Sequence, residues 1–278
     1  MNSILHVTEA YNGGVVKAIE STITSTPNFK HFLLAKSHEY DPLPNQPNST
    51  ESVEIIAWNG KNFFALAFNL RRIKNQLKPD LIHSHSSWAG LLCRIIFSRK
   101  LNIYSSHGFG FQKKDINVIF RSAIYIVESL LLLKTSVIFC YWPYEKKLAK
   151  TLLGPKTLRL CPLMMNNSSN LDTIYSNKNE HPNKKIITMG RITRAKDPEY
   201  FIRAKESISK TNQNIEFIWI GDGDYEEKKN LTNAGVAITG WLGKEDLKRE
   251  LSSADLAMFT SEWEAGPATL YESLENNV

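Results

Sequence analysis

Short β-branched runs alternate with helix-like segments along almost all of this 278-residue chain. In the first half, apolar runs bounded by turn formers predict strands at residues 3–7, 32–35, 53–56, 80–83, 102–105 and 136–140. Helical patterns lie between them, at residues 14–24, 64–77, 88–98, 116–134 and 143–152. Strands that alternate with helices imply a parallel sheet covered by helices on both faces, and therefore an α/β fold.

A second alternation of the same kind begins near residue 184. It predicts strands around residues 186, 215–220, 236–238 and 255–259, and helices at residues 198–210, 225–233 and 244–252. Residues 166–183, between the two alternations, are polar and rich in turn formers. We therefore expect a Rossmann-like acceptor-binding domain at residues 1–165, a linker at 166–183 and a nucleotide-sugar-binding domain at 184–278.

Charge is distributed unequally between the two halves. Residues 1–165 hold 20 Lys and Arg against 10 Asp and Glu, whereas residues 166–278 hold 14 against 18. A basic first half would be attracted to an anionic membrane leaflet or to an anionic lipid-linked acceptor. Scattered, solvated lysines are the alternative interpretation. No nucleic-acid-binding module is recognisable, so nucleic acid is not an expected partner.

The longest apolar stretch covers residues 116–133, and Arg121 and Glu128 interrupt it. These charges argue against a membrane span and favour a buried amphipathic helix, with a helix at a membrane surface as the alternative. No signal peptide precedes Ile4, and the three scattered cysteines fit reduced core thiols. We expect a cytoplasmic protein, with the cytoplasmic face of the inner membrane as an alternative location.

Two cations follow a predicted strand in the second half. Arg191 and Lys196 lie just after the run at residues 185–189. Two positive charges at the carboxyl end of a strand suit a pyrophosphate, which Arg can bind through two hydrogen bonds. Fixed cations there would stabilise a departing diphosphate, as a divalent metal does elsewhere. The sequence has no convincing carboxylate motif for a metal, and we expect neither a metal nor a cofactor.

Two glutamates flank a Gly-Pro turn that opens the last predicted helix. Glu264 and Glu272 have seven residues between them, which places the first on a loop and the second in the helix. A carboxylate accepts hydrogen bonds from sugar or ribose hydroxyls. Solvated surface glutamates are the alternative, but the upstream cations favour a pocket for a nucleotide diphosphate that carries a sugar.

Glycines and histidines mark the ends of strands in the first half. Gly13 and Gly14 open a helix after the first strand, where backbone can approach a phosphate closely. The absence of a GxGxxG pattern argues against a dinucleotide enzyme. His83 and His85 lack a third imidazole and so do not make a catalytic zinc site. His83 is interpreted as a core or wall residue, and His85 as the one closer to substrate.

These motifs occur in the order found in one family. In that order and at those spacings, the chain resembles the retaining glycosyltransferases of family 4, which have the GT-B fold of two facing Rossmann-like domains. The residues that carry the resemblance are Asn12-Gly13-Gly14, His83 and His85, His107-Gly108, Gly190-Arg191 with Lys196, Gly221-Asp222-Gly223, Gly240-Trp241, and the pair Glu264 and Glu272.

The resemblance implies a role for each site residue. His107 would contact the donor sugar near the reaction centre, Glu264 the sugar hydroxyls, and Glu272 the ribose hydroxyls. The implied catalytic residues are His107, Arg191, Lys196 and Glu264. The implied donor-binding residues are Gly13, Gly14, Gly221, Gly223, Trp241, Ala265, Gly266 and Glu272. Pro267 stands where many relatives have a residue with an N–H, so one backbone contact to the donor is lost.

The implied activity is transfer of a sugar from a nucleotide diphosphate, with retention of configuration, to a hydroxyl of a saccharide or lipid-linked acceptor. Synthesis of a bacterial surface polysaccharide is the expected context. Family members continue with further strand–helix units, so we expect a second domain that is truncated at its C-terminus, with activity in doubt. Two alternatives remain: a non-catalytic remnant that binds a nucleotide sugar or a partner, and a sugar-nucleotide 2-epimerase of the same architecture.

Overall fold

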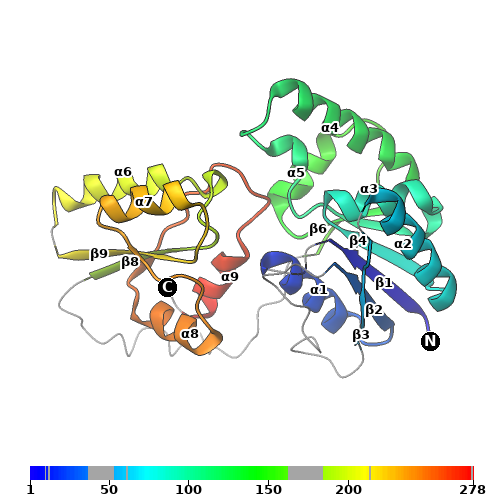
Figure 1. Ribbon diagram of the computed structural model, residues 1–278, viewed down its shortest axis with the longest axis horizontal. Helices are drawn as coiled ribbons and strands as arrows, with labels where there is room; N and C mark the ends of the chain where they lie inside the picture. Colours follow the sequence, from blue (N-terminus) through cyan, green and yellow to red (C-terminus); the bar gives the residue numbers. More distant parts are fainter. Residues whose placement is uncertain are drawn as a thin grey trace. The chain divides into compact units, whose positions relative to one another are not determined.

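The chain divides into two compact units, Met1–Met164 and Met165–Val278 (Figure 1). The computed structural model describes residues 1–9, 11, 13–36, 53–60, 62–161, 184–212, 214–276 and 278. Each unit contains a parallel sheet, and the second sheet is the smaller one, so the predicted α/β class with two Rossmann-like sheets is confirmed. The predicted linker at residues 166–183 lies outside the described residues.

The first unit is built on a seven-stranded sheet in the order β3-β2-β1-β4-β5-β6-β7, and all neighbouring strands are parallel. Its strands are β1 (Ser3–Thr8), β2 (Lys30–Ala35), β3 (Val53–Ala57), β4 (Leu81–His85), β5 (Asn102–Ser105), β6 (Val137–Cys140) and β7 (Leu158–Leu160). Its α-helices are α1 (Gly13–Ser25), α2 (Phe63–Leu77), α3 (Ser87–Ile96), α4 (Val118–Leu131) and α5 (Pro143–Thr151), and short 3-10 turns lie at Arg99–Leu101, Gly110–Gln112 and Leu132–Lys134.

Apolar side chains cover both faces of this sheet. Leu5 and Leu34 pack with residues of α2 and α3 on one face. Leu33, on the other face, packs with Ile19 and Ile23 of α1. Because successive residues of a strand point to opposite faces, a strand covered on both sides needs a nearly continuous apolar run. This is why the unbroken runs in the sequence predict these strands.

The second unit has a four-stranded parallel sheet in the order β10-β9-β8-β11. Its strands are β8 (Lys184–Met189), β9 (Ile215–Ile220), β10 (Ala237–Ile238) and β11 (Leu256–Ala257). Its helices are α6 (Pro198–Ser209), α7 (Tyr225–Asn233), α8 (Lys244–Ser253) and α9 (Ala268–Glu275), with a 3-10 turn at Arg194–Lys196. Phe201 packs against Phe217 and Trp219 on one face, and Ile187 and Ile218 pack with Leu251 of α8 on the other.

The predicted elements match the observed ones except at two strands. β7 is missing from the prediction because Leu158–Leu160 has only three residues, and two of them are exposed. The predicted strand at residues 255–259 is reduced to Leu256–Ala257, and the chain then continues as the loop that carries Glu264. Both short strands lie at a sheet edge, where pairing on one side leaves little apolar pattern to detect.

A buried ion pair fixes α4 to the rest of the first unit. Nη1 of Arg94, in α3, lies 2.9 Å from Oε2 of Glu128, and their side chains are 0% and 5% exposed. The Tyr104 hydroxyl donates to Oε1 of the same carboxylate at 3.0 Å, and the guanidinium stacks on the Tyr104 ring at 3.7 Å. Nε of Arg94 donates to the Gly90 carbonyl. Burial of two charges is tolerated here because their hydrogen bonds are largely satisfied within the protein.

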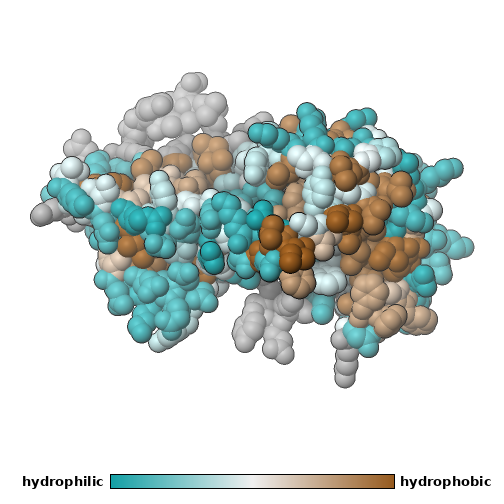
Figure 2. All heavy atoms as spheres, turned by 90° about the horizontal axis from the view of Figure 1, so that it is seen from above, coloured by the Kyte–Doolittle hydropathy of each residue, from teal (hydrophilic) through white to brown (hydrophobic). Residues whose placement is uncertain are grey.

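The opposite face of α4 is apolar and exposed, so the prediction of a buried helix is wrong for that face. Figure 2 looks onto this side of the first unit and shows hydrophobic side chains gathered over α4. We name this surface the α4 patch; it consists of Val118, Ile119, Phe120, Ile126, Val127, Leu130 and Leu133, each at least 44% exposed. Among the described residues, no helix has the length and apolarity needed to cross a membrane.

The buried pair predicts a large asymmetry between charge deletions. Glu128→Gln leaves Arg94 charged and buried without a counter-charge, so it should reduce the free energy of unfolding by about 3–5 kcal/mol. Arg203→Ala removes an exposed ion pair with Glu199 and should change it by no more than about 0.5 kcal/mol. Urea unfolding followed by circular dichroism measures both. Equal effects of the two substitutions would show that the buried pair does not hold α4.

Candidate functional site

Three neighbouring strands of the first unit end at one edge of the sheet. β1, β4 and β5 are adjacent and parallel, so the residues after their carboxyl ends come together. Gly13 (φ 51°) and Gly14 begin α1 after β1, and both are exposed. His107 follows β5 in a left-handed conformation (φ 50°) and is succeeded by Gly108 (φ 113°). Asn12, the first residue of the predicted glycine motif, lies outside the described residues.

The turn that carries His107 is held by a carboxylate that sequence analysis did not identify. Glu145 is 1% exposed and accepts the Ser106 hydroxyl at 2.6 Å and the Tyr141 N–H at 2.8 Å. The backbone N–H groups of His107 and Gly108 also bond to it, while burial raises its pKa. The signal in the sequence is Pro143 followed by a glutamate at the third position of α5, the usual place for a carboxylate that caps a helix.

Buried imidazoles extend from this turn across one face of the sheet. His6 is paired in register with His83, and His85 lies two residues further along β4, so the three rings share a face. The prediction that His83 and His85 lack a third imidazole is therefore wrong. Nδ1 of His6 lies 3.1 Å from Nε2 of His85, and Nδ1 of His85 lies 2.9 Å from Nε2 of His107. Both His83 and His85 are buried, so neither side chain is exposed to contact a ligand directly. His85 is hydrogen-bonded to His107, which is partly exposed.

Burial keeps these imidazoles neutral at ordinary pH. It lowers the pKa of His6 to about 3, with a further contribution from His31, and lowers the pKa of His107 to about 4. Burial likewise lowers the pKa values of His83 and His85 well below the usual range. A neutral imidazole has one N–H donor and one acceptor nitrogen, so each ring can link two neighbours in a chain.

In the second unit, three glycine-containing loops pack against one another through their backbones. A Cβ on Gly221 would lie 2.3 Å from the Gly190 carbonyl oxygen, and one on Gly223 would lie 2.1 Å from that of Ile192. Gly221 forms an isolated bridge with Gly240, and the Ile192 N–H donates to the carbonyl of Asp222 at 2.9 Å. These glycines are required because the loops after β8 and β9 leave no space for a side chain between them.

Lys196 and Glu264 form the centre of the predicted donor site. Nζ of Lys196 lies 2.5 Å from Oε2 of Glu264, and the two side chains are 20% and 24% exposed. The Thr260 hydroxyl donates to the Lys196 carbonyl at 2.7 Å, and the Glu262 N–H to the Ala195 carbonyl at 2.9 Å. The loop after β11 is thus joined to the turn after β8 by three contacts. They bring together two residues that are 68 positions apart.

The remaining predicted residues of this unit differ in their exposure. Arg191 is exposed directly after Gly190, and Trp241 is 64% exposed. Ala265 is buried, and Gly266 is partly buried, before Pro267 at the start of α9. Glu272 lies in the second turn of that helix and is partly buried. Gly13, Gly14 and His107 belong to the first unit, and the other predicted site residues belong to the second.

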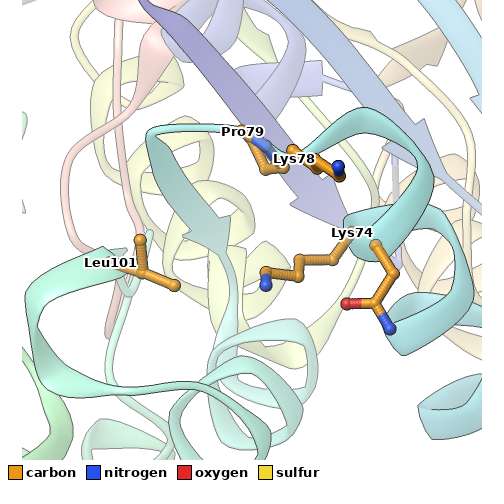
Figure 3. Close-up of a pocket in the computed structure, with 5 residues that line it drawn as sticks. Lys74, Lys78, Pro79 and Leu101 are labelled. Atoms are coloured by element: carbon orange, nitrogen blue, oxygen red, sulfur yellow. The ribbon is translucent and has the colours of Figure 1, made fainter.

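An open depression of the first unit lies away from these residues. Figure 3 shows its lining, which comes from the C-terminal end of α2 and the residues that follow it, together with Leu101. Lys78 and Pro79 precede β4, and Leu101 precedes β5, so the depression lies at the amino ends of the strands. Ligands of open parallel sheets bind at the carboxyl ends. We therefore do not include the depression in the candidate site.

The second unit matches a known family. Residues 171–278 match the family model described as "Glycosyl transferases group 1". A Klebsiella pneumoniae protein described as an "Uncharacterized 41.2 kDa protein in cps region" is 25% identical over 282 residues, covering 95% of this chain and 75% of its own. The Escherichia coli UDP-Gal:alpha-D-GlcNAc-diphosphoundecaprenol alpha-1,3-galactosyltransferase is 23% identical over 234 residues, covering 74% of this chain and 58% of its own.

The fold is also similar to that of solved structures. HepE from Anabaena, crystallised in complex with UDP-glucose, superposes with a TM-score of 0.76 at 14% identity, covering 99% of this chain and 79% of that protein. At that identity the likeness establishes the fold, which is GT-B, and leaves the substrate open. The chain spans about four fifths of this protein and just under three fifths of the Escherichia coli relative.

The buried imidazoles predict a pH dependence of stability. Their folded pKa values lie below the unfolded value of 6.5, so the unfolded chain binds more protons as the pH falls. The free energy of unfolding should be at its full value above pH 6.5. As the pH falls from 6.5 towards 4, each such histidine should lower it by about 1.4 kcal/mol per pH unit. Urea unfolding at pH 7.5, 6.0 and 5.0 measures this slope. His83→Gln should reduce this slope by the contribution of one histidine. An unchanged slope would contradict the conclusion that burial lowers the pKa of His83.

Proposed function

We propose that this chain transfers a sugar from a nucleotide diphosphate to an acceptor hydroxyl in the synthesis of a bacterial surface polysaccharide, because its residues 171–278 match the group 1 glycosyltransferases and its fold is GT-B. The observation that carries the proposal is the pairing of Lys196 with Glu264 beside the close-packed glycine loops. This pairing supports a donor site that has one group for phosphate and one for sugar hydroxyls. The matching family favours transfer over 2-epimerisation.

Arg191 and Lys196 would act on the leaving group. In the reaction, the bond between the anomeric carbon and the β-phosphate oxygen breaks, and the acceptor oxygen bonds to that carbon from the same face. The proton of the acceptor hydroxyl passes to the departing phosphate, so no protein nucleophile is needed. Negative charge grows on the diphosphate as it leaves, and fixed cations stabilise this charge more in the transition state than in the ground state.

The ion pair links recognition of the two ends of the donor. Nζ of Lys196 donates to Oε2 of Glu264 at 2.5 Å. A diphosphate that binds Lys196 competes with this carboxylate, which then becomes available to sugar hydroxyls. Glu272 and Trp241 would contact the nucleoside, and His107 the sugar. The release of Glu264 would therefore favour a nucleotide that carries a sugar over the bare nucleotide.

The relatives suggest classes of substrate. The Escherichia coli relative is named for a UDP-galactose donor and a diphosphoundecaprenol-linked acceptor, and the structure of HepE was determined with UDP-glucose. We therefore propose a UDP-hexose as donor and a lipid-linked saccharide as acceptor for this chain. The acceptor would bind to the basic first unit, as its balance of 20 Lys and Arg against 10 Asp and Glu in residues 1–165 suggests.

Nucleotide titration tests the donor site. UDP and GDP are titrated into the purified chain while the fluorescence of Trp241 and the other tryptophans is followed. The combination of Arg191→Ala with Lys196→Ala should weaken UDP binding at least tenfold, which corresponds to about 1.4 kcal/mol. Arg194→Ala is the matched control, because it removes an exposed charge from the same loop and should have less than about a twofold effect.

Each outcome of the titration decides a different point. Binding that is lost in the double variant and kept in Arg194→Ala supports the proposed donor site and identifies the base. Equal losses in both variants would mean that the loop attracts nucleotides only through its net charge. A folded chain that binds neither nucleotide would contradict a donor site in this polypeptide.

We further propose that the α4 patch binds an anionic lipid surface. Its apolar side chains follow a helical stripe, with Ile119, Ile126 and Leu130 on one side of α4. The buried ion pair on the opposite side holds the helix in place while this stripe faces outward. Contiguous exposed apolar surface of this kind marks an interaction site in a soluble protein.

Charges around the α4 patch favour lipid over a protein partner. Lys113 and Lys114 are exposed just before the helix, and Lys134 is exposed just after it. An apolar stripe flanked by lysines matches a helix that lies in a membrane interface, because the side chains enter the acyl boundary while the ammonium groups contact anionic headgroups. Such binding would place the enzyme beside a lipid-linked acceptor.

Vesicle sedimentation tests this surface. Vesicles of phosphatidylglycerol and phosphatidylcholine should bind the chain, and vesicles of phosphatidylcholine alone should bind it less. Ile126→Asp with Leu130→Asp should lower the partition coefficient at least tenfold, since each buried side chain contributes about 1.5–3 kcal/mol. Phe64→Asp with Phe68→Asp in α2 is the matched control, because these side chains are 81% and 71% exposed.

Two results would contradict the membrane proposal. One is an equal loss of vesicle binding in the α2 control. The other is a dimer of the wild-type chain, seen by sedimentation in the absence of vesicles, that dissociates in the α4 variant. The second result would identify the α4 patch as an interface between copies of the chain.

A further inference from the structure

One face of the first sheet carries a chain of hydrogen-bonded imidazoles that ends at His107. Nδ1 of His31 lies 3.1 Å from Nε2 of His6, and Nδ1 of His6 lies 3.1 Å from Nε2 of His85. Nδ1 of His85 lies 2.9 Å from Nε2 of His107. The proposed reaction makes no use of the three inner histidines, although buried polar side chains are costly to keep. Their arrangement therefore calls for a role.

The far end of this chain sets the position of every proton in it. Nε2 of His31 lies 3.1 Å from the carbonyl oxygen of Thr26 and 3.4 Å from its hydroxyl oxygen. A carbonyl can only accept a hydrogen bond. The Thr26 hydroxyl donates its own hydrogen to the carbonyl of Thr22 at 2.6 Å, so it too can only accept here. Nε2 of His31 must therefore carry a hydrogen.

The proton positions of the other rings follow from this one. Burial lowers the pKa of His31, so its ring is neutral and its Nδ1 has no hydrogen. That nitrogen accepts from Nε2–H of His6, whose bare Nδ1 in turn accepts from Nε2–H of His85. The bare Nδ1 of His85 accepts from Nε2–H of His107. All four rings thus have their hydrogen on Nε2, and Nδ1 of His107 is bare.

Ring stacking fixes the orientation of His107. Its ring lies against that of His85, with centroids 5.2 Å apart and an interplanar angle of 17°. On the Tyr141 ring the corresponding values are 5.2 Å and 14°. The Tyr141 hydroxyl hydrogen-bonds with Thr22 at 2.9 Å, and Glu145 holds the backbone of the turn. Because Nε2 is already bonded to His85, Nδ1 is the polar atom that remains for a ligand.

We propose that His31, His6 and His85 are positioning residues that hold His107 in its Nε2–H tautomer and present its Nδ1 to the ligand as a hydrogen-bond acceptor. Such an atom accepts from a hydroxyl and cannot donate to a phosphate oxygen. Under the proposed function, on which this inference rests for the identity of the ligand, His107 would therefore select a neutral sugar hydroxyl. The backbone carbonyl of Thr26 sets this preference through the three intervening rings.

A metal ion would require a different arrangement of the same side chains. His6, His83 and His85 each offer a ring nitrogen, and these atoms lie within 4.8 Å of one another. Nδ1 of His6 and Nε2 of His85, which a metal ion could use there, are already joined by one hydrogen bond of the chain at 3.1 Å. Nε2 of His83 lies 2.9 Å from the Ser105 hydroxyl, so His83 stands beside the chain without being a link in it.

Long-range ¹H–¹⁵N correlation spectra of the ¹⁵N-histidine-labelled, ligand-free chain at pH 7.5 report the tautomer of each ring directly. His107 is assigned by the loss of its signals in His107→Gln. In the wild-type chain, its Nε2–H tautomer should exceed the Nδ1–H tautomer at least tenfold, because a reversed chain would leave the bare Nε2 of His31 facing the carbonyl oxygen of Thr26, one acceptor against another. A protonated ring, an Nδ1–H tautomer, or one equivalent of bound divalent metal by mass spectrometry would overturn the proposal.

A matched pair of variants tests transmission along the chain. His31→Leu removes the donor that sets the direction, and His107 should then show both tautomers in comparable amounts. His83→Gln alters a neighbouring buried histidine outside the chain and should leave the His107 tautomer unchanged. A His31→Leu variant that retains the wild-type tautomer would overturn the proposal. Since no nucleotide is added, these results are independent of whether the titration finds a donor site, and the assigned wild-type spectrum decides even if His31→Leu or His83→Gln does not fold.

Discussion

Every pair of neighbouring strands in both sheets is parallel, and this constraint determines where chemistry can lie. A parallel strand covered on both faces uses its backbone groups and most of its side chains for structure. Polar residues that bind a ligand are therefore concentrated in the loops after the carboxyl ends of the strands. The turn with His107, the glycine loops of the second unit and the loop with Glu264 all occupy such positions. Each is held by contacts made within its own unit.

Much of the fold follows from local patterns in the sequence. Continuous apolar runs predict the buried strands, and Pro143 and Pro198 mark the first turns of helices where their missing N–H costs nothing. Gly221 and Gly223 were expected to bind the donor, and Gly190 to precede one of the two cations. The structure gives them a second reason, because their loops touch one another through backbone atoms. The roles of Lys196, Glu264 and Glu272 remain predictions, although the contact between the first two follows their expected proximity.

Features that depend on register and on distant neighbours could not be predicted in this way. The link from His31 to His107 requires the strand order β2-β1-β4 and a register that places the rings of His31, His6 and His85 on one face. Neither is visible in a single sequence, although the alternation of His83 and His85 indicates that these two share a face. The preferred prediction of a buried helix was wrong for the outer side of α4 for a similar reason. The apolar composition of α4 predicts burial. Composition alone does not show that an ion pair between Arg94 and Glu128 holds the inner side of the helix while its apolar side chains stay exposed.

The anchoring of α4 through one face has a consequence for how this surface can change. Because the ion pair, Tyr104 and the Gly90 carbonyl hold the helix from its inner side, the outer side chains contribute little to folding. Exposed apolar residues of a folded protein can be replaced at small cost in stability. Over evolutionary time, the outer surface of α4 is therefore free to adapt to a different surrounding while the catalytic scaffold stays constant. A mutational path that alters this surface need not pass through an unfolded intermediate.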